Sequence, residues 1–66
     1  MILEINGERR TVPAVENVRE LLRYLELGED RIAVELNRKI VLRKEWHKTS
    51  INDRDKIEIV QFVGGG

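Results

Sequence analysis

One segment of this chain has the apolar spacing of a helix, and the other apolar segments alternate as strands do. Four apolar residues of that segment fall at i, i+3, i+4 and i+7: Val18, Leu21, Leu22 and Leu25. Asn17, with Glu20 three residues later, is a suitable N-cap. Gly28 is a suitable C-terminal cap, so the pattern predicts a helix over about 17–27. A lone helix of about three turns must bury its apolar face against a sheet.

Short strands account for most of the remaining chain. Alternation and turn signals predict strands in five segments: Met1–Asn6, Arg9–Val12, Ile32–Asn37, Ile40–Leu42 and Lys56–Val63. Asn6-Gly7 predicts a type I′ hairpin turn, because asparagine and glycine both tolerate positive φ. Pro13 ends the second strand because it has no N–H to donate. Arg43–Ser50 is polar apart from one tryptophan, and predicts a loop with a helical turn.

A hairpin, a crossing helix and further strands, in this order, predict an α+β fold of the β-grasp type. The expected architecture is a mixed sheet of four to five strands packed on one helix. Its first and last strands should be central, parallel neighbours, which their apolar content allows. The chain has no internal repeat and no linker, so residues 1–63 are predicted to form a single domain and residues 64–66 a flexible glycine tail.

The composition argues against several classes of protein. The 66 residues include no cysteine and no cluster of metal-ligating side chains, so neither a disulfide nor a metal site is expected. Twelve basic and twelve acidic residues are interspersed, which argues against nucleic acid as a partner. No apolar stretch reaches the ~20 residues that a membrane helix needs. Met1 leads into a strand without a signal-peptide pattern, so we expect a cytoplasmic protein with no membrane partner.

The chain closes with Gly64, Gly65 and Gly66, directly after an apolar strand. Glycine has no Cβ, so such a tail gains little from ordering on its own domain. It can instead slide into a narrow channel of another protein and present a carboxylate at the far end. The alternative interpretation is a frayed terminus or a remnant of expression.

Six features carry a family resemblance when they are taken in order. They are the Asn6-Gly7 hairpin, the Val18–Leu25 helix, the Ala33–Asn37 strand, the Arg43–Trp46 segment, the Ile51–Ile59 segment and the Phe62–Gly66 end. Together they resemble the ThiS family, the small sulfur carriers of thiamine biosynthesis, which have a ubiquitin-like β-grasp fold. One residue departs from the family pattern, because Arg54 stands where the family usually has glycine. A left-handed residue other than glycine costs roughly 1 kcal/mol, unless Asn52 and Asp53 reshape the turn.

The resemblance implies a chemistry for the last residue. An ATP-dependent adenylating enzyme of the ubiquitin-activating type would convert the Gly66 carboxylate into an acyl-adenylate. Sulfur from a persulfide donor would then displace AMP and leave a thiocarboxylate on Gly66, which would donate its sulfur to thiazole synthase. The chain would thus be a protein co-substrate rather than an enzyme. It would bind no cofactor itself, and ATP would be used by its partner.

A surface that docks on the adenylating enzyme should be recognisable among the residues of the last strand. If Ile57 and Ile59 face the helix, Val60 and Phe62 face outward, just before the tail. Exposed apolar residues at this place suit a partner-binding patch, to which we also assign Val63. The alternative is that the loop around Trp46 covers them.

The other chemically notable residues favour structural roles. His47 lies in a polar stretch and is expected to be a solvated loop residue, and the pair Glu29-Asp30 is expected to solvate the end of the helix. Trp46 is interpreted as a lid over the sheet edge, and Ile51 as a lone core residue.

Three other functions stay open at this stage. The small subunit of molybdopterin synthase has the same fold and the same tail chemistry. A ubiquitin-like modifier would instead join Gly66 to lysine amines. A plain β-grasp binding module would have an inert tail.

Overall fold

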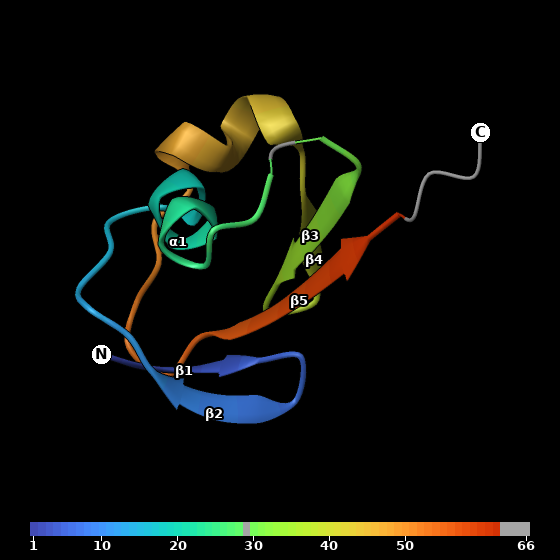
Figure 1. Cartoon of the computed structure of the whole chain (residues 1–66). Coiled ribbons are helices and arrows are strands. Elements are labelled where there is room, and N and C mark those ends of the chain that lie inside the picture. Colours follow the sequence, from blue (N-terminus) through green and yellow to red (C-terminus); the bar gives the residue numbers. More distant parts are fainter. Residues whose placement is uncertain (29, 63–66) are drawn as a thin grey trace.

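A five-stranded sheet and an α-helix make up most of the computed structural model, which describes residues 1–28 and 30–62 (Figure 1). The elements are β1 (Ile2–Ile5), β2 (Glu8–Thr11), α1 (Val18–Tyr24), β3 (Ile32–Leu36), β4 (Lys39–Val41), the 3-10 helix η1 (Arg43–Lys48) and β5 (Lys56–Gln61). The strand order is β2-β1-β5-β3-β4; β1 and β5 are parallel, and the other neighbouring pairs are antiparallel. The predicted α+β class is therefore confirmed, as is the parallel pairing of the first and last strands in the interior of the sheet.

The helix begins where the sequence predicts but ends earlier. Asn17 Oδ1 accepts a hydrogen bond from the Glu20 N–H at 2.9 Å, and the Glu20 carboxylate accepts one from the N–H of Glu16 at 3.0 Å. The first bond satisfies a donor that the first helical turn leaves without a partner, and the second ties the residue before the N-cap to the helix. At the other end α1 stops at Tyr24, so the predicted extension to about residue 27 is wrong.

The residue that reverses the chain after α1 is Glu26 and not Gly28, as the sequence had suggested. Glu26 has φ 59°, its N–H donates to the Arg23 carbonyl, and the N–H of Leu27 donates to the Leu22 carbonyl, both at 3.0 Å. This pair of bonds is a Schellman motif. The reversal lets the partly buried Leu27 pack against the core, and the apolar surface removed from water there offsets the roughly 1 kcal/mol of strain.

Two hairpin turns of the same type flank the central strands. Asn6 and Gly7 have φ 51° and 83°, which confirms the predicted type I′ turn. Asn37 and Arg38 have φ 50° and 71° between β3 and β4, so β4 spans Lys39–Val41 and not the predicted Ile40–Leu42. Both asparagine side chains also bind β5: Asn6 bonds both the N–H and the carbonyl of Ile59, and Asn37 Oδ1 accepts from the Lys56 N–H at 3.0 Å.

Trp46 belongs to the core and is not the lid over the sheet edge that the sequence suggested. Its side chain is 1% exposed, and its indole N–H donates to the Val41 carbonyl at 3.0 Å. η1, which carries this residue, lies beside α1 (Figure 1). The predicted core role of Ile51 is confirmed, since it is buried in the same cluster as Trp46.

The turn before β5 contains strain that a single substitution should relieve. The Asp55 N–H donates to the Asn52 carbonyl at 3.1 Å, and Arg54 has φ 74° at the third turn position. Asn52 and Asp53 therefore do not reshape the turn, which is of the type II form that favours glycine at this position. We expect Arg54→Gly to raise the free energy of unfolding by about 1 kcal/mol and the melting temperature by about 4–8 °C.

Thermal unfolding followed by circular dichroism checks this expectation. The matched control is Arg54→Ala, which removes the exposed 3.6 Å ion pair with Asp53 but keeps the Cβ. An exposed pair contributes about 0–1 kcal/mol, so the alanine variant should differ little from wild type. An equal gain for both variants would show that backbone strain at Arg54 is not the cause.

Candidate functional site

The predicted tail residues lie beyond the part of the chain that the structure describes. Gly64, Gly65, Gly66 and the candidate docking residue Val63 are all outside the described residues. The structure does describe the strand that leads to them. β5 runs to Gln61, and the N–H of Phe62 extends the pairing with a 2.7 Å hydrogen bond to the Arg31 carbonyl.

The side chains of β5 alternate between the core and the surface as the sequence predicts. Ile57 and Ile59 are buried in the core cluster. Val60 is 53% exposed and Phe62 is 57% exposed, on the side of the sheet away from α1. The alternative in which the Trp46 loop covers them is wrong, because Trp46 is itself enclosed in the core.

The exposed apolar surface is wider than the sequence indicated. Ile40 is 73% exposed and Leu42 is 51% exposed, and Ala33, directly opposite Val60 in the β3–β5 pairing, is exposed as well. We call these residues the outer patch: Ala33, Ile40, Leu42, Val60 and Phe62. Sequence reasoning missed the β4 side of the outer patch, although the alternation of side chains around Val41 indicated it. Because Val41 is buried, its neighbours Ile40 and Leu42 must point outward.

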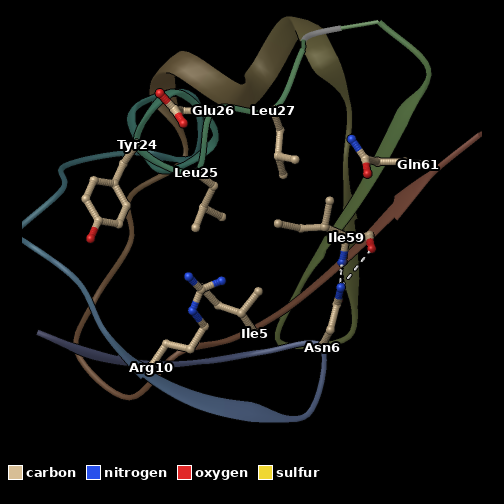
Figure 2. Close-up of a pocket in the computed structure, with 9 residues that line it drawn as sticks. All are labelled: Ile5, Asn6, Arg10, Tyr24, Leu25, Glu26, Leu27, Ile59 and Gln61. Atoms are coloured by element: carbon tan, nitrogen blue, oxygen red, sulfur yellow. Dashed lines mark hydrogen bonds between the residues drawn. The ribbon is translucent and has the colours of Figure 1, made fainter.

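A cleft of about 500 Å³ opens on the opposite side of the sheet (Figure 2). Its lining residues come from the β1–β2 hairpin, from α1 and the turn after it, and from β5: Ile5, Asn6, Arg10, Tyr24, Leu25, Glu26, Leu27, Ile59 and Gln61. The cleft exists because α1 ends at Tyr24 and leaves this end of the sheet uncovered. Its volume lies within the range of about 300–1,000 Å³ found for small-molecule sites. Its lining contains no cysteine, serine or histidine, so it offers a binding surface without an evident nucleophile.

The remaining candidates for chemistry do not assemble into a site. His47 is exposed on η1, as expected. Asp30 forms an exposed ion pair with Arg43 at 3.3 Å, while its neighbour Glu29 is outside the described residues. Among residues 1–28 and 30–62 no group of three His, Cys, Asp or Glu side chains could hold a metal ion. The same residues include no helix with the length and apolar character needed to cross a membrane.

Comparisons with known proteins agree on one family. The family model described as the ThiS family matches residues 3–66 of this chain. The sulfur carrier protein ThiS of Bacillus subtilis is 35% identical over 66 residues, which cover 98% of this chain and 100% of that protein. The crystal structure of the thiamine biosynthesis protein ThiS from Geobacter metallireducens matches with a TM-score of 0.83 and 38% identity, and the match covers 100% of both chains.

A third relative matches the whole length of this chain with one part of a longer protein. The thiazole synthase of Paramagnetospirillum magneticum is 44% identical over 66 residues, which are 100% of this chain and 20% of that protein. A domain similar to this chain is therefore joined there to a much larger one.

Proposed function

Because this chain belongs to the ThiS family of sulfur carriers for thiamine biosynthesis, we propose that the carboxylate of Gly66 is the group that carries the sulfur. The observation that supports this most is the extent of the family match, which runs through the three glycines to residue 66. A ThiS-family protein is a carrier and not an enzyme, so the catalytic groups belong to its partners.

The chemistry needs activation from outside the chain, because the negative charge of a carboxylate repels nucleophiles. In the proposed sequence a Gly66 oxygen attacks the α-phosphorus of ATP on an adenylating enzyme of the ubiquitin-activating type, and pyrophosphate leaves. The terminal sulfur of a persulfide donor then attacks the acyl carbon and AMP leaves. A thiol cleaves the resulting sulfur–sulfur bond, which frees the Gly66 thiocarboxylate and forms a disulfide.

Two partners follow from this sequence of steps. Val60 and Phe62 of the outer patch directly precede the tail in the sequence, so we assign docking of the adenylating enzyme to Val60, Phe62 and Val63. Four large apolar side chains exposed together on one face suit a protein interface. Thiazole synthase is the proposed sulfur acceptor, and the relative that joins both parts in one chain supports this assignment.

The intact mass of the protein tests the proposal directly. We expect incubation with ATP, the adenylating enzyme and a persulfide donor, followed by a thiol, to add the mass difference between sulfur and oxygen. The gain should depend on ATP and should be absent from a variant that lacks Gly66. Addition of thiazole synthase with its other substrates should then return the mass to its starting value.

Three results would contradict the proposal in whole or in part. A competent adenylating enzyme that leaves the mass unchanged would exclude the sulfur-carrier role and favour the inert binding module. Transfer of Gly66 to lysine amines, detected as conjugates in the native host, would favour the ubiquitin-like modifier. Release of sulfur to the large subunit of molybdopterin synthase, with none to thiazole synthase, would reassign the acceptor.

A further inference from the structure

Two carboxylates face each other across the exposed side of the sheet. Glu35 of β3 and Glu58 of β5 are direct partners in the antiparallel pairing, and both are exposed. Side chains directly opposite each other have Cβ atoms about 4.5–5.5 Å apart, and like charges in such positions destabilise a sheet. The fold thus has an unfavourable pair of charges at a place where almost any polar residue would fit.

Nothing within the described residues neutralises this pair. Neither carboxylate forms an ion pair or a hydrogen bond there. The nearest basic side chain on the same face of β5 is Lys56, which is opposite Glu4 on β1, and Glu4 is in turn opposite Arg9 on β2. The charges therefore alternate on that side, and the two neighbouring glutamates interrupt the alternation.

The glutamate pair lies inside the outer patch. Ile40 is directly opposite Glu35 on β4, and the next exposed pair along β3 and β5 is Ala33 with Val60. A protein that covers this apolar surface would also remove water from the two carboxylates. Buried charges are tolerated only when they are paired, so the covering surface must supply a cation between them.

We propose that the adenylating enzyme docks on the outer patch with an apolar surface that carries an arginine, and that this arginine lies between Glu35 and Glu58. The inference rests on the proposed function, which supplies the partner. A guanidinium suits the position better than an ammonium, because its planar set of donors can bind two carboxylates at once. The repulsion present in the free carrier then becomes an attraction in the complex.

Substitution of Glu58 should change stability and binding in opposite directions. In the isolated carrier Glu58→Lys replaces the repulsion with an attractive pair, so we expect the melting temperature to rise by about 2–4 °C. The same change places a cation against the arginine of the partner, so we expect affinity for the adenylating enzyme to fall about tenfold or more. Calorimetric titration measures the affinity without any need for sulfur transfer.

The control is Glu8→Lys, the same change of charge at an exposed position of the edge strand β2. It should leave the affinity within about twofold of wild type, because a distant surface charge is screened by salt. A second variant, Glu58→Gln, removes the charge without adding a longer side chain and should weaken binding less than lysine does.

Three results would overturn the inference. Equal affinities for Glu58→Lys and Glu8→Lys would exclude an arginine at this pair. A loss of affinity for thiazole synthase alone would assign the surface to another partner, and an absence of binding by the wild-type carrier would remove the docking surface itself. If the wild type binds but gains no sulfur in the mass experiment, the proposed function fails while the docking inference stands.

Discussion

Replacement of Trp46 by alanine is expected to remove most of the stability of this protein. The side chain is 1% exposed and belongs to the core cluster. Truncation of a buried aromatic residue to alanine costs about 3–5 kcal/mol. At about 0.05–0.15 kcal/mol per residue, a chain of 66 residues has a total stability of only about 3–10 kcal/mol. Urea denaturation followed by circular dichroism should therefore show a variant that is partly or largely unfolded at 37 °C.

The hydrogen bond of Trp46 makes a second variant informative. Trp46→Phe keeps most of the buried apolar surface but loses the donor that the Val41 carbonyl uses at 3.0 Å. The loss of one hydrogen bond costs about 0.5–1.5 kcal/mol, so this variant should fall between wild type and Trp46→Ala. Tyr24→Ala at an exposed site of α1 is the control and should change the stability little. A Trp46→Ala variant as stable as this control would mean that the tryptophan does not support the core.

The features predicted correctly from sequence are those that depend on neighbouring residues. The Asn6-Gly7 turn needs only two residues that accept positive φ, and the N-cap at Asn17 needs only the N–H of Glu20. The alternation of β5 likewise placed Val60 and Phe62 on the exposed face. In each case the local chemistry has one favourable solution, and the rest of the fold agrees with it.

The features that sequence reasoning missed depend on distant parts of the chain. Gly28 was a sound choice for a helix cap on propensity alone, but packing of Leu27 on the core places the reversal at Glu26. Trp46 was expected at an edge, because nothing near it in sequence shows that η1 lies beside α1. Tertiary packing decided both positions, and local preference accounts for only about 1 kcal/mol at either one.

The carboxylate pair in the outer patch also depends on distant parts of the chain. The opposition of Glu35 and Glu58 exists only in the register that pairs β3 with β5, and a shift of one residue would send every side chain to the other face. Sequence patterns predict which residues of a strand share a face. They do not show which residues of another strand lie opposite, and this information is what identified the carboxylate pair.

A methyl group on Gly65 is expected to slow thiocarboxylate formation about a hundredfold without any change in the fold. The proposed reaction needs the tail to enter an enclosed channel of the adenylating enzyme, where an added Cβ would displace the Gly66 carboxylate from the reacting phosphorus. A misplacement of about 1 Å at a reacting group can cost this much in rate. Initial rates of the mass gain, measured for Gly65→Ala against wild type at saturating enzyme, test the expectation.

The same glycine-to-alanine substitution at two other positions distinguishes an effect on entry into the channel from an effect on the fold. At Gly28 an added Cβ meets no atom within 4 Å and the backbone does not have positive φ, so Gly28→Ala should keep both stability and rate. At Gly7, with φ 83°, alanine is strained and should lower the stability by about 1–2 kcal/mol while the rate stays near wild type. A tail that only tethers the carboxylate would tolerate Gly65→Ala as well as Gly28→Ala, because a flexible tether has no need for bare backbone. A normal rate for Gly65→Ala would thus exclude the narrow channel, whereas a loss confined to Gly65 would explain why the chain closes with glycine.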